Sequence, residues 1–196
     1  MRVRSIVFTF AALSFSVLNA ADYSAGLKAY QKKDYGTAHT EWGPLAKQGN
    51  PDALYGLGTM YDNGEGVAQD HKKAMGYYLQ AAQQGHAWAQ TDLATIYYDG
   101  KGVAQDYSQA FRWYTLAANQ GNSQAQLNLG VMYGVGQGTK TDLVTAYMWA
   151  TLAGAGGEQK GASLQASLAK QMQPGQIAKA KELARQFQPK AAAPVK

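Results

Sequence analysis

A period of 36 residues constrains this chain more than any other feature. Gly49, Gly85, Gly121 and Gly157 follow one another at that spacing. Seven further sets share it: Ala53, Ala89 and Ala125; Leu57, Leu93 and Leu129; Tyr61, Tyr97 and Tyr133; Gly64, Gly100 and Gly136; Gly66, Gly102 and Gly138; Asp70, Asp106 and Asp142; Ala74, Ala110 and Ala146. A fixed period of this length is the signature of a solenoid, in which each unit contacts only its neighbours.

The first half of each unit has the pattern of an amphipathic helix. Asn50 precedes Pro51, as expected for an N-cap followed by proline at the first helical position. The apolar residues that follow recur at helical spacing: Ala53, Leu57, Met60 and Tyr61. We predict a helix, called helix A, that ends near Asp62. The small residue after the repeated leucine lets a second helix approach closely.

A glycine-rich loop follows helix A in all three units. Its copies are Asn63-Gly64-Glu65-Gly66-Val67, Asp99-Gly100-Lys101-Gly102-Val103 and Val135-Gly136-Gln137-Gly138-Thr139. A phosphate-binding loop would need a lysine directly after the glycine and a preceding strand, and this chain has neither pattern. We therefore assign the glycines to a helix C-cap and a tight turn, where a positive φ is needed.

A second helix, helix B, is predicted after each loop. Asp70, Asp106 and Asp142 precede it, with Asp34 in the same register upstream. An aspartate there caps the helix and meets the positive end of its dipole. Because these carboxylates repeat, capping explains them better than paired acid–base catalysis does. Alanines and aromatic residues alternate along helix B, which suits close packing of neighbouring helices.

These residues resemble a known family. The stretch from Leu57 to Gly85 reads L-G-x-M-Y-x-x-G-x-G-V-x-Q-D-x-x-x-A-x-x-Y-Y-x-x-A-A-x-Q-G and resembles the Sel-1-like repeat, a relative of the tetratricopeptide repeat. The copies from Leu93 and Leu129 match it too, although Thr139 replaces valine in the third. The resemblance implies an all-α, right-handed superhelical solenoid of antiparallel helix pairs, used for protein–protein interaction.

The organisation expected along the chain has five parts. Residues 1–20 form a signal peptide, 21–49 an N-terminal capping helix pair and 50–157 three repeats. Residues 158–187 form a C-terminal capping helix pair, and 188–196 a disordered tail rich in proline and alanine. Truncated first units and amphipathic last helices are typical of capping elements, which cover the ends of a repeat core.

The first twenty residues predict export. Arg2 and Arg4 precede an apolar run from Ile6 to Leu18, and Leu18-Asn19-Ala20 provides a small residue at a cleavage site. We expect the mature protein to begin near Ala21 and to be periplasmic or secreted. An uncleaved anchor is the alternative, but the run is shorter than the roughly 20 apolar residues that a spanning helix needs.

Composition and charge narrow the classes of partner. The sequence contains no cysteine, which excludes disulfides, thiolate metal sites and a lipoprotein anchor. Its net charge of +5 falls to +3 without Arg2 and Arg4, too small an excess to indicate nucleic acid binding. Residues 158–196 contain seven basic and two acidic residues. That basic end could touch lipid or cell-wall polymer, but a solvated helix face is the commoner explanation. We expect no membrane contact after cleavage.

No catalytic constellation stands out, so we do not expect an enzyme, a cofactor or a bound metal. His39, His71 and His86 match no local metal-ligand spacing, and His86 occupies the helix-A cap position of Asn50 and Asn122. No serine lies in a G-x-S-x-G elbow. The main hypothesis is an exported scaffold that binds a protein or peptide of unknown identity. The alternative is an accessory or weak enzyme acting on cell-wall or β-lactam-like substrates.

A partner is expected on the inner, concave wall, which helix A lines in tetratricopeptide-like solenoids. Offsetting from the packed positions of helix A selects the candidate partner-binding residues: Tyr55, Thr59, Asp62, Trp88, Thr91, Asp92, Thr95, Tyr98, Leu127, Asn128 and Val131. These positions vary between units while the packed ones do not. Tyr55, Trp88 and Tyr98 are aromatic, and aromatic residues are enriched among those that dominate binding energy. The alternative is that these aromatic side chains pack against neighbouring helices.

Overall fold

The computed structural model describes residues 18–191, with side chains from Tyr23 onward. The predicted signal peptide falls mainly on residues outside this range, as do residues 192–196 of the predicted tail. The described part forms ten helices and no strand: α1 (Leu18–Gln31), α2 (Tyr35–Lys47), α3 (Pro51–Asn63), α4 (His71–Gln83), α5 (Ala87–Asp99), α6 (Tyr107–Asn119), α7 (Ser123–Val135), α8 (Leu143–Ala155), α9 (Lys160–Ala169) and α10 (Pro174–Gln186).

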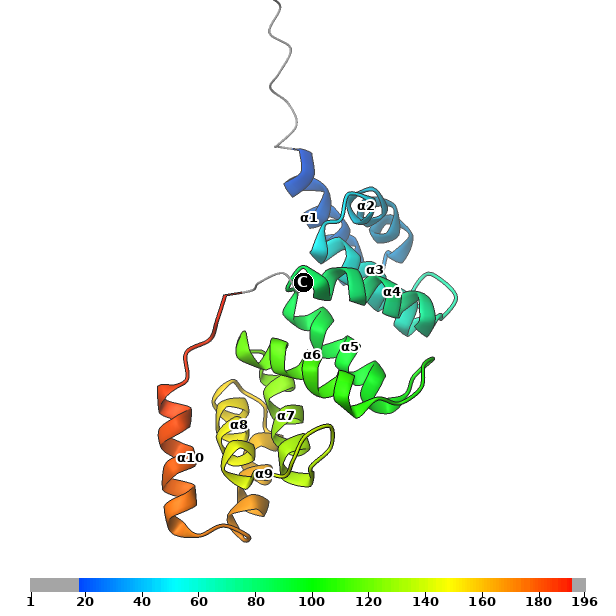
Figure 1. Ribbon diagram of the computed structural model, residues 1–196. Helices are drawn as coiled ribbons and strands as arrows, with labels where there is room; N and C mark the ends of the chain where they lie inside the picture. The colour runs from blue at the N-terminus through cyan, green and yellow to red at the C-terminus, as the bar shows by residue number, and fades with distance from the viewer. Residues whose placement is uncertain (1–17, 192–196) are drawn as a thin grey trace, which may run out of the picture.

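The helices stack in sequence order into an elongated array (Figure 1). Each odd-numbered helix up to α7 pairs with the helix after it, and each pair contacts the next one. The predicted all-α solenoid is confirmed. Helices α3, α5 and α7 are the three copies of helix A, and α4, α6 and α8 are the three copies of helix B. None of the described helices combines the length and apolar character needed to cross a membrane.

The predicted caps are confirmed at both ends of the repeated helices. Asp34, Asp70, Asp106 and Asp142 each accept a hydrogen bond from a backbone N–H in the first turn of the following helix B. Asn50 and Asn122 do the same for α3 and α7. The helix-A copies end at Gly64, Gly100 and Gly136, whose φ values of 72°, 72° and 75° lie in the left-handed region. Glycine adopts this conformation without the steric cost of a Cβ.

The second glycine of each loop has a role that the sequence did not show. Gly66, Gly102 and Gly138 lie against the first residue of helix B in the preceding unit: Tyr35, His71 and Tyr107 respectively. A Cβ on Gly102 would lie 3.3 Å from the Cβ of His71, and a Cβ on Gly138 would collide with the carbonyl oxygen of Tyr107. These glycines therefore allow the loop of one unit to stack on the unit before it.

The core runs along the array as alternating small and large side chains. The repeated alanine and leucine of helix A, at most 2% exposed, pack against the buried alanines of helix B. A Cβ on Gly58 would lie 2.6 Å from the ring of Tyr78, so the small residue predicted there does admit the neighbouring helix. Two buried glutamines bridge units: Gln90 and Gln126 donate to the carbonyls of Ala82 and Ala118 at the end of the preceding helix B.

The C-terminal helices depart from the pairing of the repeats. Helix α9 packs on α8 and α7, whereas α10 packs on α8. The chain then folds back, with the Phe187 ring 5.4 Å from that of Trp149, centroid to centroid, and the Lys190 N–H donating to the Asn119 carbonyl over 2.8 Å. The described beginning of the predicted tail is therefore held against the end of α6.

Substitution of two loop glycines distinguishes the cost of backbone strain from the cost of lost close packing. Gly138→Ala and Gly157→Ala both place a side chain at positive φ, which costs about 1 kcal/mol. Only the Gly138 variant also drives a Cβ into the Tyr107 carbonyl, because no atom lies within 4 Å of a Cβ on Gly157. We expect Gly138→Ala to lower the free energy of urea unfolding by about 1–3 kcal/mol more than Gly157→Ala. Equal losses would show that this loop does not control stacking.

Candidate functional site

The candidate site lies on the side of the solenoid formed by α1, α3, α5 and α7, here called the A face. The eleven predicted binding positions fall on α3, α5 and α7. Trp88 is the most open aromatic residue among them, at 54% exposure. Thr91 and Leu127 are buried, at 2% and 5% exposure, and therefore lie beneath the surface instead of on it. The other positions are half-buried.

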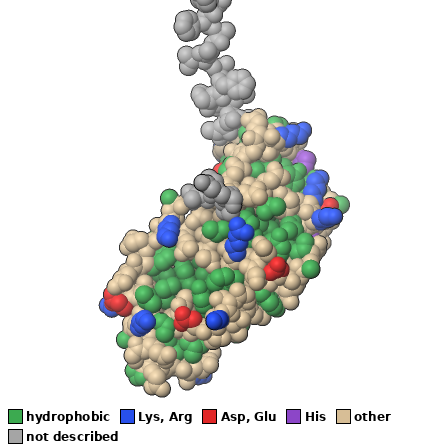
Figure 2. Space-filling view, viewed as in Figure 1, with side chains coloured by type: hydrophobic (Ala, Val, Ile, Leu, Met, Phe, Trp, Pro, Cys, Tyr) green, Lys and Arg blue, Asp and Glu red, His purple; other side chains and the backbone are tan. Residues whose placement is uncertain are grey.

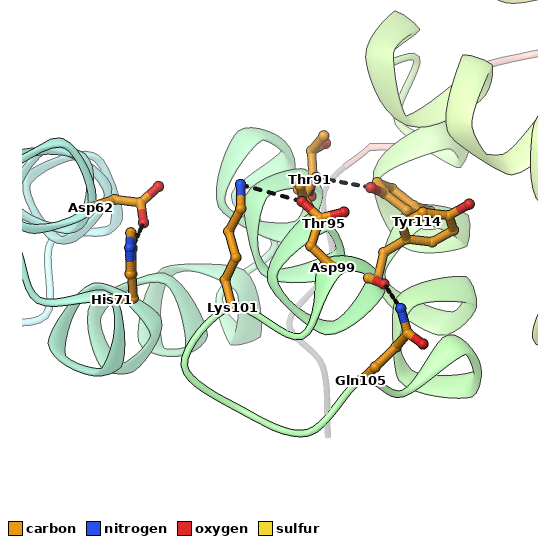
Figure 3. A network of polar contacts seen from close by, with 9 residues as sticks. Asp62, His71, Thr91, Thr95, Asp99, Lys101, Gln105 and Tyr114 are labelled. Atoms are coloured by element: carbon orange, nitrogen blue, oxygen red, sulfur yellow. Dashed lines mark hydrogen bonds and ion pairs between the residues drawn. The ribbon is translucent and has the colours of Figure 1, made fainter.

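One hollow lies on the A face between α5 and α7. Its cavity measures about 190 Å³ and is lined by Thr95, Tyr98, Asp99, Tyr114, Asn128 and Val131. The Thr95 and Tyr114 hydroxyls lie 2.8 Å apart, and Asp99 of the lining pairs with Lys101 over 3.2 Å (Figure 3). Burial raises the pKa of Tyr114 to about 12, so this hydroxyl stays neutral. The sequence predicted four of the six lining residues.

An equivalent hollow lies two units earlier, between α1 and α3. Its cavity measures about 210 Å³ and is lined by Tyr23, Leu27, Tyr30, Trp42, Tyr55, Gly56 and Thr59. Five of these positions match lining positions of the α5–α7 hollow at a spacing of two periods: Tyr23 and Thr95, Leu27 and Asp99, Trp42 and Tyr114, Gly56 and Asn128, Thr59 and Val131. The hollows are thus a property of the repeat. The sequence prediction missed the α1 and α2 walls because it took candidate positions only from helix A of the three full units.

Two carboxylates lie at the junction between these hollows, where α3 meets α5. The Asp62 carboxylate is 2.7 Å from Nδ1 of His71, at the start of α4 (Figure 3). Asp92 is half-buried and interacts with the Tyr55 hydroxyl. Burial is the main cause that raises the pKa of Asp92 to about 6, and the negative charge of Asp62 adds to it.

Tyr55 and His86 pack against each other in this part of the A face. Their rings stack with centroids 4.6 Å apart, and the Tyr55 ring also lies 5.7 Å from that of Tyr78. The packing alternative for Tyr55 therefore holds, although its hydroxyl still reaches Asp92. His86 caps α5, because its Nδ1 accepts the Ala89 N–H over 3.1 Å. The hydrogen of His86 is then on Nε2, which lies 3.3 Å from Oδ1 of Asp52.

Two larger cavities lie away from the A face, and the sequence did not suggest either. One, of about 610 Å³, lies between α8 and α10, with apolar walls and Lys181 and Arg185 among its lining residues. The other, of about 540 Å³, is lined mainly by α2, α3 and α4. Figure 2 shows apolar side chains gathered where α6 and α8 lie, with charged side chains around them. Among residues 23–191, no three His, Asp or Glu side chains group closely enough to hold a metal ion.

Comparison with known proteins identifies the repeat family of this architecture. The family model described as Sel1 repeat matches residues 51–86, 89–122 and 123–158. A solved Sel1 repeat protein from Oxalobacter formigenes is similar, with 33% identity, a TM-score of 0.67, and coverage of 69% of this chain and 56% of that one. So is c5321, a protective antigen of uropathogenic Escherichia coli strains with an SLR fold, with 28% identity, a TM-score of 0.55, and coverage of 86% and 45%. This chain thus spans about half the length of these relatives. No curated protein matches it.

The His86 cap makes the stability of α5 depend on pH. Burial lowers the pKa of His86 below its ordinary value of 6.5, with Asp52 opposing the shift. A lowered folded-state pKa means that its stabilising contribution is complete above pH 6.5 and is lost as the pH falls from there through the lowered folded-state pKa. His86→Asn restores the cap of the neighbouring units and should remove this loss. His86→Ala should cost about 1 kcal/mol at pH 8, because the cap is gone. Urea unfolding at pH 8 and pH 5.5 measures both, and a His86→Asn variant as pH-sensitive as the wild type would contradict the assignment.

Asp92 should destabilise the folded protein at neutral pH. A raised folded-state pKa means that the favourable contribution exists at low pH and is lost as the pH rises through about 6. We expect the free energy of unfolding of Asp92→Asn to exceed that of the wild type by about 2 kcal/mol at pH 7.5. The difference should shrink toward zero near pH 4. Urea titrations at the two pH values test this. A variant no more stable than the wild type at pH 7.5 would show that the buried charge is fully compensated.

Proposed function

Because this chain belongs to the Sel1 repeat family, we propose that it is an exported, non-enzymatic scaffold that binds a protein or peptide partner on the A face, the wall predicted to be concave. Sel1 repeats generally mediate protein interactions, and the family is generally non-enzymatic. The hollows between successive A helices support the choice of face. Their walls place aromatic rings beside hydroxyl groups, which suits recognition of side chains that are partly apolar and partly polar.

The equivalence of the hollows is the observation that carries this proposal. A solenoid presents its repeated face as a row of similar sites, so a partner segment can contact several units at once. The walls of the two cavities differ at all five matched positions, while the packed positions behind them keep their alanine and leucine. Variation in the walls of the hollows over a constant set of packed positions suits recognition of one particular sequence.

Residues 1–20 support the proposed location in the cell envelope. They combine a basic start, an apolar run and a small residue before the expected cut, which is the pattern of a secretory signal. Because the chain has no cysteine, folding in an oxidising compartment would not require correct disulfide pairing.

Paired variants on opposite sides of the solenoid test the binding face. The protein from Ala21 onward is immobilised and exposed to envelope extract, and the captured protein is identified and quantified. Trp88→Ala combined with Tyr98→Ala should reduce its capture at least about tenfold, because two aromatic contacts are lost. Lys72→Ala combined with Gln83→Ala alters exposed positions of α4 and should leave capture unchanged. Equal capture by the A-face variant, with its helicity intact, would move the binding site elsewhere.

Export is tested by the mass of the mature protein. We expect the species recovered from the periplasm or medium to begin at or near Ala21, because the apolar run ends just before it. Intact mass and N-terminal sequencing measure this directly. A mature species that retains residues 1–20 would replace export in soluble form with membrane anchoring.

A further inference from the structure

The A face contains a third, middle junction that follows the same register as the two hollows. One period after the α1–α3 hollow, the matching residues lie on α3, α4 and α5: Thr59, Asn63, Tyr78, Asp92 and Thr95. The structure brings several of them together, because Tyr78 interacts with Thr59 and with the charges of Asp62 and Asp92. We call this set, with Asp62, the middle junction.

One position distinguishes the three junctions. The residue that helix A of the later unit places beside the aromatic ring of helix B is Gly56 in the first, Asp92 in the middle one and Asn128 in the third. Gly56 leaves room for the large ring of Trp42. Asn128 interacts with the hydroxyl of Tyr114. The middle junction also has a tyrosine, so a neutral asparagine would suffice there, and the fold does not require the carboxylate of Asp92.

Asp92 forms no ion pair within residues 23–191. The one cation whose charge acts on it there, Lys101, is paired with Asp99. The groups that act on it are the Tyr55 hydroxyl and Asp62 from α3, Tyr78 from α4, and the charge of Lys101. Asp62 in turn lies 2.7 Å from Nδ1 of His71, at the start of α4. A half-buried carboxylate that interacts with one neutral hydroxyl and lies near a second carboxylate is costly to the free protein. Its raised pKa is consistent with that cost.

We propose that the partner segment places a lysine or arginine side chain in the middle junction, where Asp92 and Asp62 neutralise it, while its neighbouring side chains occupy the two flanking hollows. This inference rests on the proposed function, because it names the chemistry of the partner that the A face binds. The partner is thus a protein or peptide segment with a cationic residue between less polar ones.

Charge and shape both favour this occupant. Residues 21–157, which include the A face, contain eleven acidic and nine basic residues, so the small net negative charge of this part favours a cation over an anion there. The aliphatic part of a lysine or arginine side chain can lie along the Tyr55 and Tyr78 rings while its charged end reaches the carboxylates. The flanking hollows, of about 210 and 190 Å³, are lined by tyrosines and a leucine or valine. The one carboxylate among their lining residues, Asp99, is already paired with Lys101, so both hollows suit uncharged side chains.

Peptide pools with matched central residues test the proposal. Fluorescein-labelled, amidated heptapeptide pools, free of acidic residues, histidine and cysteine, carry lysine, norleucine, arginine or citrulline at the fourth position. Fluorescence polarisation with the mature protein at pH 7.5 should show at least about tenfold tighter binding for lysine over norleucine and for arginine over citrulline. Asp92→Asn should remove this preference. Glu158→Gln, which changes the net charge equally but lies beyond the repeats, should keep it.

The pH dependence provides a second measurement on the same pools. A cation binds only the ionised carboxylate, and the pKa of about 6 for Asp92 leaves about one molecule in ten ionised at pH 5. Lysine-pool affinity should therefore weaken about tenfold between pH 7.5 and pH 5 in the wild type and change little in Asp92→Asn.

The outcomes separate this inference from the proposed function. Equal binding of charged and neutral pools, with binding lost in the Trp88→Ala and Tyr98→Ala variant, would overturn the cationic partner and keep the A face as the binding surface. A charge preference that survives Asp92→Asn would place the cation elsewhere and overturn the inference. Failure of every pool to bind would count against peptide recognition by the A face and would overturn both.

Discussion

The solenoid depends on the contact between the second glycine of each loop and the start of helix B in the unit before it. Gly138 can lie against the Tyr107 carbonyl only because it has no side chain, and Gly66 and Gly102 make the equivalent approach to Tyr35 and His71. This contact fixes how far one helix pair lies from the next. The distance between successive A helices, and therefore the hollows between them, follows from it.

The sequence predicted the elements of this fold well because each unit repeats its local signals. Asp70 and its copies cap helix B, and Gly64 and its copies end helix A, as their residue types require. Other features depend on atoms that meet only after folding. The packing of α10 on α8, the buried bridge made by Gln90 and the approach of Gly138 to Tyr107 have no periodic signal.

The candidate site was predicted only in part, for the same reason. Periodicity selected Thr95, Tyr98, Asn128 and Val131, which do line one hollow, because a fixed spacing puts a residue on a fixed side of its helix. It also selected Thr91 and Leu127, which are buried, because the spacing does not reveal how closely the neighbouring helix approaches. The stacking of Tyr55 on His86 could not be foreseen, since the ring belongs to the next unit.

The return of the chain after α10 changes how this array comes apart. A linear solenoid opens from its ends, one unit at a time, because each unit touches only its neighbours. Here Phe187 packs on Trp149 of α8, and Lys190 is bonded to Asn119 at the end of α6. The last helix therefore cannot detach alone without also uncovering parts of two earlier units. We therefore expect the C-terminal half to open as one cooperative block and fraying to begin at the N-terminal end.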